Sequence, residues 1–322
     1  MKFKVKIKFQ LILISCLVAI LVLLSGYLYF QDEKKATRQD KYNELQAIAK
    51  LKSDQLSQWH RERMSEARFF STGQPYTELT ARILRGEEDN KEKYIRSLMR
   101  IMSDYRYENI FMIDKSGNLL FSVVPGEVII DSVLIHLSAE ITQKKEIKKR
   151  DLYYSTSDKK IYLDFLAPVF DYQGEVGSIL VFRVNPADYL FPLIGDWPTP
   201  SKTAESVIAR REGDSIRILN NIRNKDNSKL DITESIGKTE MPAVRAVLGY
   251  SGIFKGVDYI GNKVLCDLRG VPETSWFMAT KQDESELFKD LNKQAVLIII
   301  VILLTLFFLG ATLAWVYNNN QR

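Results

Sequence analysis

Charged residues are missing from two long stretches near the ends of the chain. The first covers residues 9–31 and the second begins at Ala295 and ends at Tyr317, and both consist mainly of Leu, Ile, Val and Phe. A helix needs about 20 apolar residues to cross the hydrocarbon core of a bilayer. We therefore predict two transmembrane helices, one over the first stretch and one over residues 294–317.

The first stretch has an alternative interpretation as a cleaved signal peptide, because Lys occupies positions 2, 4, 6 and 8 ahead of it. Its apolar part is longer than the roughly 7 to 15 residues of a signal peptide, and no A-x-A cleavage site follows. We favour an uncleaved anchor. The four lysines then hold residues 1–8 in the cytoplasm, so the middle of the chain lies outside and residues 318–322 return to the cytoplasm.

Residues 32–75 are predicted to form one long helix outside the membrane. Neither Pro nor Gly occurs in this segment before Gly73, and apolar pairs recur every eleven residues. The six residues of this stripe are Leu45, Ile48, Leu56, Trp59, Ala67 and Phe70. Eleven residues make about three helical turns, so the stripe is nearly straight. It either packs against the domain that the helix supports or forms a dimer seam, and the two alternatives are compatible.

After the long helix the hydrophobic period changes, and it predicts a first module over residues 76–196. A helix runs from about residue 90 to 104, with apolar residues three and four apart. Two strands joined by a turn at Gly117 follow, and residues 128–144 are predicted to be helical. Three more strands are predicted over residues 151–156, 160–170 and 176–184.

The same order recurs over residues 197–292, which we predict to be a second module. VIARREGDSIRIL around Gly213 repeats the strand, turn and strand of FMIDKSGNLLFSV around Gly117. NKVLCDLRGV then matches KKIYLDFLAPV, which places Asp267 opposite Asp164. Two tandem copies of one unit explain these matches. The predicted fold class is α+β, with a long N-terminal helix, two antiparallel-sheet modules and two flanking transmembrane helices.

Charge and cysteine content narrow the possible partners. The formal net charge is +5, and the four N-terminal lysines with Arg322 account for all of it, so the segment between the apolar stretches is neutral. Nucleic acid is therefore not an expected partner. Cys16 lies in the first apolar stretch and Cys266 is the only other cysteine, so the outer segment cannot form an internal disulfide.

Few residues suit catalysis or metal binding. The only histidines are His60, expected to face solvent from the long helix, and His136, expected to pack from an apolar helical stretch. They support neither a histidine-based nucleophile relay nor a two-histidine metal site. Cys266 alternates with apolar residues and is expected in the core. We expect no catalytic residue, no metal and no cofactor.

Three segments carry a resemblance to a known family: YENIFMIDKSGNLLFS, IYLDFLAPVFDYQGEVGSILVF and YLFPLIGDWPTPSKTAES. Together with the order of helices and sheets, they resemble the double Cache sensors of bacterial transmembrane receptors, most closely the input parts of sensor histidine kinases. The resemblance implies tandem PAS-like sheets, a small-molecule ligand in the membrane-distal module and a relay role for the proximal module.

The sequence departs from the members of this family that bind amino acids. Those members carry an Arg-x-Trp-Tyr segment, a tyrosine on the following strand and an aspartate on the last strand. No such segment lies between Val124 and Arg150, and Ile179 stands where the aspartate is expected. Only Tyr153 matches. The resemblance therefore leaves the ligand class open.

Polar and aromatic residues around the distal sheet form the candidate ligand site, because small-molecule pockets combine apolar walls with a few converging polar groups. The candidate ligand-binding residues are Arg106, Tyr107, Tyr153, Ser155, Tyr162, Asp164 and Arg183. Either arginine suits a bidentate pair with a ligand carboxylate, although each is also compatible with a surface position. A structural role for Asp164 is equally compatible, given its match to Asp267.

The architecture predicts a sensor in the cytoplasmic (inner) membrane rather than an enzyme. The expected partners are a small-molecule ligand, the membrane and a second copy of the chain, paired through the long helix and the transmembrane helices. A histidine kinase beyond Arg322, or a separate protein, is expected to supply the output. The alternative is a polysaccharide chain-length regulator, a protein whose outer domain consists mainly of long helices. A third alternative, an anchored hydrolase, needs a catalytic constellation that the sequence does not offer.

Overall fold

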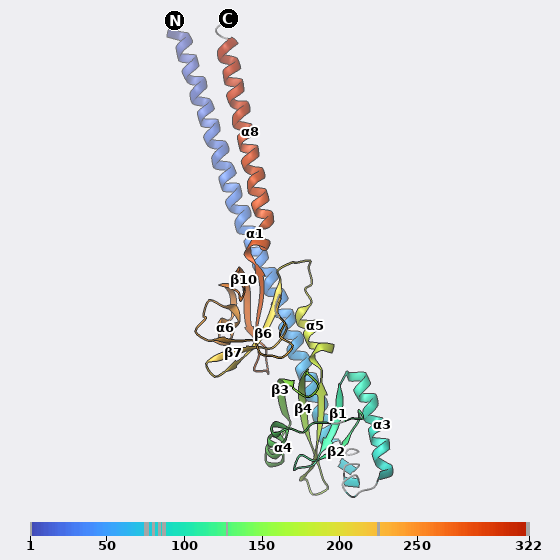
Figure 1. Cartoon of the computed structure of the whole chain (residues 1–322). Helices are drawn as coiled ribbons and strands as arrows, with labels where there is room; N and C mark the ends of the chain where they lie inside the picture. Colours follow the sequence, from blue (N-terminus) through green and yellow to red (C-terminus); the bar gives the residue numbers. More distant parts are fainter. Residues whose placement is uncertain are drawn as a thin grey trace.

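The computed structural model describes residues 2–73, 77–78, 81–82, 85, 88–126, 128–223 and 226–319. Its longest element is α1 (Lys2–Thr72), a helix of 71 residues that contains the first apolar stretch and the predicted outer helix. The predicted end of that helix at residue 75 lies outside the described residues. The 31-residue helix α8 (Lys289–Asn319) runs beside the first part of α1 (Figure 1).

Both α1 and α8 contain a segment long and apolar enough to cross a membrane. In the most apolar 18-residue window of each helix, none of the residues is buried within the protein. A Cβ built on Gly26 of α1 would lie 2.7 Å from Cδ1 of Ile302 on α8, so the absence of a side chain at this position allows the helices to approach closely. The apolar surfaces of this helix pair therefore need lipid around them.

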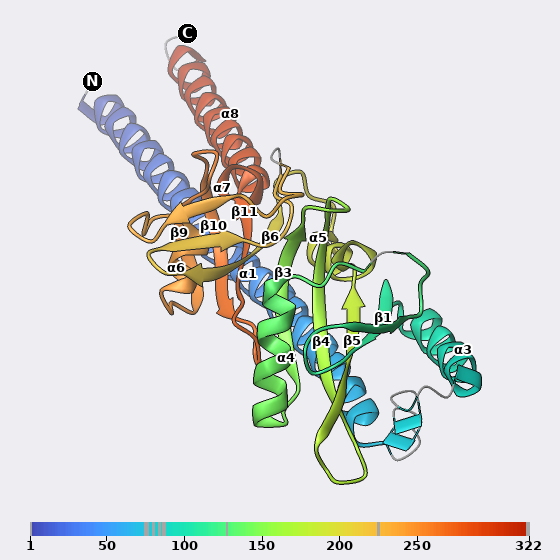
Figure 2. The ribbon, with the colours of Figure 1, turned by 60° about the horizontal axis from the view of Figure 1, so that its bottom comes forward.

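The distal module follows α1. Its antiparallel sheet has five strands in the order β2-β1-β5-β4-β3. The helix α3 (Glu88–Tyr105) precedes the sheet, whose strands are β1 (Asn109–Ile113), β2 (Leu119–Ser122), β3 (Lys148–Ser155), β4 (Lys160–Phe170) and β5 (Val176–Val184). The helix α4 (Ser132–Lys144) covers one face and α1 the other (Figure 2). The short helices η1 (Pro186–Asp188) and α5 (Leu190–Gly195) close the module.

The proximal module repeats this plan between the distal module and the apolar helices (Figure 1). Its sheet has six strands in the order β8-β7-β6-β11-β10-β9. They are β6 (Glu205–Glu212), β7 (Ser215–Ile218), β8 (Thr233–Ser235), β9 (Gly252–Val257), β10 (Lys263–Gly270) and β11 (Phe277–Asp283). The helix α6 (Pro242–Val247) packs on the face away from α1, and α7 (Glu284–Leu287) leads into α8. The predicted two-module α+β fold is confirmed, and sheets of this extent disfavour a chain-length regulator.

The eleven-residue stripe on α1 is an internal packing surface. All six of its residues are buried, with relative exposures of 8 % or less. Leu45 joins Leu265 of the proximal sheet in one apolar cluster. The ring of Phe70 lies 5.2 Å from that of Phe182 on the distal sheet. One continuous helix therefore contacts both sheets, which is the packing alternative of the sequence analysis.

The two aspartates matched in the sequence point to opposite faces of their sheets. Asp164 lies on the α4 face, whereas Asp267 lies on the α1 face and accepts a hydrogen bond of 2.5 Å from Arg269. Cys266, buried against Ala246 of α6, occupies the face that corresponds to Asp164. Side chains alternate along a strand, so a one-residue slip in the match exchanges the faces. The predicted correspondence of Asp267 with Asp164 is therefore wrong, while the core position of Cys266 is confirmed.

Both predictions for the histidines are also wrong. His60 is only 6 % exposed, and its ring lies 5.9 Å from that of Phe165 on β4. The buried face of α1 is wider than its apolar stripe and includes polar residues such as Lys52 and Ser57. His136 is exposed because α4 buries the face formed by Leu134, Ser138 and Ile141.

Lys52 ties α1 to the junction between the modules. Its ammonium group donates hydrogen bonds to the carbonyl oxygens of Leu193 (3.3 Å), Ile194 (2.5 Å) and Asp196 (2.5 Å), at the C-terminal end of α5. A cation at this end of a helix satisfies carbonyl groups that have no partner within the helix. Burial lowers the pKa of Lys52 to about 8, although Asp196 opposes this shift.

Candidate ligand-binding site

Five of the seven predicted residues lie on one face of the distal sheet, the face that α4 covers. Tyr153 and Ser155 are on β3, Tyr162 and Asp164 are on β4, and Arg183 is on β5. The strand register places Tyr153 opposite Tyr162 and Asp164 opposite Arg183. Alternate residues of the same strands form the apolar face against α1. The alternation thus separates the core from a polar face.

Asp164 is the centre of a hydrogen-bond network on this face. It is fully buried, and its two oxygens accept bonds from Nε (3.0 Å) and Nη2 (3.1 Å) of Arg183. The hydroxyl of Tyr153 donates a third bond of 2.8 Å to Asp164. The guanidinium of Arg183 also lies over the rings of Phe111 (5.0 Å) and Tyr162 (4.9 Å). A buried carboxylate is stable only with such partners.

The protonation states of this network are fixed by its own charges. Burial lowers the pKa of Arg183, but the Asp164 carboxylate raises it more, so the net shift is upward. Burial raises the pKa of Tyr153, and the adjacent Asp164 carboxylate raises it further. The guanidinium therefore remains charged and the phenol remains a donor to Asp164. The phenolic oxygen keeps lone pairs with which it can accept a bond from a ligand.

A second charged pair, Asp131 and Arg150, lies beside this network. Asp131 is the N-cap of α4 and accepts a bond of 3.0 Å from the backbone N–H of Leu134. Arg150 donates to its two oxygens at 3.1 and 2.6 Å, and the guanidinium carbon lies 3.5 Å above the ring of Tyr153. Burial raises the pKa of Asp131, but the Leu134 N–H and Arg150 lower it more, so this carboxylate stays ionised.

Both charged pairs contribute residues to the lining of a cavity of about 350 Å³. Its lining residues are Ile129, Asp131, Arg150, Tyr153, Tyr154, Ser155, Thr156, Ser157, Asp158 and Arg183. Asp158 also accepts a hydrogen bond from the hydroxyl of Tyr162. The lining offers guanidinium and hydroxyl donors together with carboxylate acceptors, and its volume suits one small molecule. Among the described residues, no group of three or more His, Cys, Asp or Glu is placed to hold a metal ion.

Arg106 and Tyr107 do not reach this cavity. Arg106 lines a separate cavity of about 270 Å³ beside α1, together with Trp59. Tyr107 is buried on the α1 face, where its hydroxyl donates to Glu66 and its ring lies 5.2 Å from the guanidinium of Arg63. The structure therefore divides the seven predicted residues into a cluster of five and a pair that contacts the long helix.

Asp131, Arg150 and Asp158 are cavity residues that the sequence analysis missed. Asp131 had a recognisable signal, since an aspartate directly before a helical stretch is a preferred N-cap. Nothing local distinguishes Arg150 from the other cations around it. Its position over Tyr153 follows from the pairing of β3 with β4 and from the placement of α4.

Solved structures with the same fold are ligand-binding domains of bacterial chemoreceptors. That of CtaA from Pseudomonas fluorescens, in complex with L-serine, has a TM-score of 0.53 at 10% identity, covering 77% of this chain and 99% of that chain. PctB from Pseudomonas aeruginosa, in complex with L-Gln, has a TM-score of 0.53 at 11% identity, covering 78% and 97%. Tlp3 from Campylobacter jejuni, with 4-methylisoleucine, has a TM-score of 0.57 at 14% identity, covering 78% and 94%.

These similarities define the class of the chain by its fold. The predicted architecture of two sheet modules on one long helix, with an apolar segment at each end, is confirmed, and it is the fold of these ligand-binding domains. The structural neighbours are sensor domains rather than enzymes. No protein-family model matches the sequence, and no curated protein matches it. At 10% to 14% identity the likeness extends to the fold and not to individual residues.

Proposed function

We propose that this chain is the extracytoplasmic input region of a receptor in the cytoplasmic membrane and that it binds a small polar molecule in the distal cavity. The observation that carries this proposal is the cavity itself, which lies between the segment leading into α4 and the polar face of the distal sheet. The fold supports it, because CtaA, PctB and Tlp3 were each solved with an amino acid or a close relative of one bound.

The charges around the cavity favour a ligand without net charge. Both guanidiniums that line it are already paired, Arg150 with Asp131 and Arg183 with Asp164. A ligand with a single charge would have to compete with one of these pairs. A zwitterion or a neutral hydrogen-bonding molecule would instead add bonds to both kinds of group. The cavity volume of about 350 Å³ limits the ligand to a small molecule.

The long helix provides a route for the signal. α1 packs against the distal sheet on the face opposite the cavity and continues without a break into the apolar segment. A ligand that binds one arrangement of sheet and helix more tightly shifts the population toward it, with coupling of about 1 to 3 kcal/mol in typical systems. We further propose that two chains pair through their apolar helices. A histidine kinase then supplies the output.

The test is a thermal-unfolding screen of the full chain in phosphatidylcholine nanodiscs, against zwitterionic, neutral, anionic and cationic small molecules. A bound ligand at 100 times its Kd stabilises the folded state by about 2.7 kcal/mol. Arg150→Gln removes a donor from the cavity wall, whereas Arg106→Gln is a matched change in the separate cavity beside α1. We expect Arg150→Gln to abolish the ligand-induced shift and Arg106→Gln to retain it.

Two results would contradict this assignment. A shift lost in Arg106→Gln but kept in Arg150→Gln would place the ligand in the cavity beside α1. No shift with any compound, from a sample that unfolds cooperatively, would favour a protein or a membrane-derived stimulus over a small molecule.

A further inference from the structure

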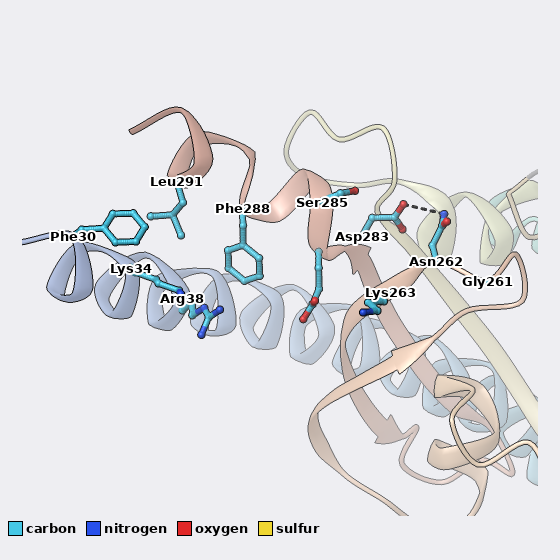
Figure 3. Close-up of a pocket in the computed structure, with 11 residues that line it drawn as sticks. Phe30, Lys34, Arg38, Gly261, Asn262, Lys263, Asp283, Ser285, Phe288 and Leu291 are labelled. Atoms are coloured by element: carbon cyan, nitrogen blue, oxygen red, sulfur yellow. Dashed lines mark hydrogen bonds between the residues drawn. The ribbon is translucent and has the colours of Figure 1, made fainter. Parts of the chain in front are cut away.

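A larger cavity lies at the other end of the outer domain, where the apolar helices meet the proximal module. It has a volume of about 590 Å³ and is enclosed by α1, the start of α8 and the turn between β9 and β10 (Figure 3). Its lining residues are Phe30, Lys34, Arg38, Gly261, Asn262, Lys263, Asp283, Glu284, Ser285, Phe288 and Leu291. None of them belongs to the distal ligand site.

The lining of this cavity combines apolar and basic side chains. Phe288 and Leu291 point from the start of α8 toward α1, where Phe30 lies in the last turn of the apolar stretch (Figure 3). Lys34 and Arg38 follow Phe30 at intervals of four residues, so the three side chains share one face of α1.

The three cations in the lining have no acidic partners. The Lys34 ammonium lies 6.0 Å from the ring of Phe30, and the Arg38 guanidinium lies 5.6 Å from the ring of Phe288. Lys263, at the start of β10, supplies a third cation. In the part of the chain that the structure describes, none of these three groups forms an ion pair or a hydrogen bond.

The two carboxylates in the lining have partners other than these three cations. Asp283 accepts a hydrogen bond of 3.1 Å from the amide of Asn262. Glu284 lies 3.2 Å from the ammonium of Lys255, outside this cavity. Three cations without an acidic partner therefore remain to attract an anion.

The distance from the apolar stretch places Lys34 and Arg38 at the height of lipid headgroups. Lys34 and Arg38 follow the last residue of that stretch, Gln31, by three and seven positions. At about 1.5 Å per helical residue, their Cα atoms lie roughly 5 and 10 Å beyond it. The headgroup layer is about 5 to 8 Å thick on each side of the hydrocarbon core. Long basic side chains bend back toward this layer.

We propose that this cavity binds the headgroup of an anionic phospholipid. The phosphodiester lies beside Lys34 and Arg38, and the glycerol backbone with the first acyl carbons lies against Phe30 and Leu291. A lipid in this position contacts both apolar helices and the proximal sheet, so it fixes their relative positions. The proposal depends on α1 and α8 crossing the membrane and is independent of any ligand in the distal cavity.

The test measures how much phosphatidylglycerol the full chain retains from nanodiscs of 80% phosphatidylcholine and 20% phosphatidylglycerol, by native mass spectrometry. The double variant Lys34→Gln/Arg38→Gln removes two cations from the cavity. The matched control Lys35→Gln/Lys289→Gln removes two exposed cations outside it, near the same membrane surface. General attraction to an anionic surface contributes about fivefold in affinity per basic residue and affects both variants alike. Direct contact with the phosphodiester is lost in the first variant only, so we expect its retention of phosphatidylglycerol to fall several-fold further than that of the control.

Thermal unfolding separates a lipid from a soluble phosphate as the ligand. It is compared in phosphatidylcholine nanodiscs alone, in nanodiscs that also contain phosphatidylglycerol, and in phosphatidylcholine nanodiscs with added glycerol 3-phosphate or inorganic phosphate. Stabilisation by phosphatidylglycerol but by neither soluble anion supports the proposal. Equal stabilisation by a soluble anion would overturn the assignment to lipid. Equal loss of phosphatidylglycerol in the cavity variant and the control would also overturn it, because general charge attraction would then explain retention. Unchanged unfolding of both variants in phosphatidylcholine alone shows that they fold.

Discussion

The last strands of the two modules carry buried cations at equivalent positions but use them differently. Arg183 lies two residues before Asn185, the N-cap of η1, and Lys281 lies two residues before Asp283, the N-cap of α7. Arg183 pairs with Asp164 on the neighbouring strand and lines a cavity. The residue opposite Lys281 on the neighbouring strand is Cys266.

Lys281 has one partner, Glu205, directly opposite on β6, its other neighbouring strand, and a second, Asp258, just after the edge strand β9. Its ammonium lies 2.7 Å from Asp258 and 3.1 Å from Glu205. Tyr259 donates a hydrogen bond of 2.8 Å to Glu205, and its ring lies 4.7 Å from the ammonium of Lys281. These groups satisfy one another, and the side chain of Lys281 is only 5% exposed. The same scaffold thus holds a closed ionic cluster in the proximal module and, in the distal module, an ionic cluster that lines a cavity.

Removing the closed cluster should have the largest effect on stability. Lys281→Met leaves Asp258 and Glu205 buried without their cation, and breaking a buried pair in this way costs about 3 to 5 kcal/mol. Lys255→Met is the control, since Lys255 is half exposed in its ion pair with Glu284 and should cost under about 1 kcal/mol. Urea unfolding of the full chain in detergent measures both.

The comparison between modules also predicts that Lys281→Met leaves ligand binding intact. The ligand-induced thermal shift should persist in this variant, because the cluster lies outside the distal cavity. A loss of unfolding free energy below about 1 kcal/mol, or loss of the ligand-induced thermal shift, would contradict this distinction between the proximal and the distal module.

Acid should weaken the contact between α1 and the distal sheet. Burial, with a smaller effect of Lys149, lowers the pKa of His60 to about 4, although Glu273 and Asp151 oppose the shift. The unfolded chain takes up this proton near pH 6.5, so the unfolded state binds more protons between pH 6.5 and 4. The contribution of His60 to the unfolding free energy is therefore fully present above pH 6.5. It falls by about 2 to 3 kcal/mol as the pH drops to 4.

The variant His60→Leu isolates this contribution. Neither ring nitrogen of His60 has a hydrogen-bond partner within the described residues, so an apolar side chain of similar size should be tolerated. The difference in unfolding free energy between wild type and variant should change between pH 6.5 and 4 and stay constant above pH 7. A constant difference over the whole range would show that His60 is not responsible for acid sensitivity.

The smallest expected difference between the modules is in the stability cost of replacing the turn glycine of each hairpin. Gly117 and Gly213 both have positive φ, of 89° and 60°, where a residue with a Cβ is strained. A Cβ on Gly117 would also lie 2.9 Å from Cγ1 of Ile135 on α4, whereas a Cβ on Gly213 would meet nothing within 4 Å. We expect Gly117→Ala to cost about 2 kcal/mol and Gly213→Ala about 1 kcal/mol in unfolding free energy. Equal costs would mean that α4 yields to the added methyl group.

Local patterns were sufficient to predict the elements and their order. The strands predicted over residues 160–170 and 176–184 coincide with β4 and β5, because alternation and turn residues are encoded within each segment. The apolar stretches and the eleven-residue stripe likewise predicted α1 and its buried side. Tyr153 and Ser155 were recognised as sharing a strand face because that inference needs only a period of two.

The tertiary structure decided which distant residues meet. The pairing of β3 with β4 and the position of α4 bring Arg150 and Asp131 to Tyr153, and no local pattern encodes a contact across 19 residues. Strand register turned Asp267 away from the face that Asp164 occupies. His60 is buried because the buried face of α1 is wider than its apolar stripe. The sequence by itself determined helices, strands and their duplication, because these depend on neighbouring residues; the cavities formed only where packing brought separate elements together.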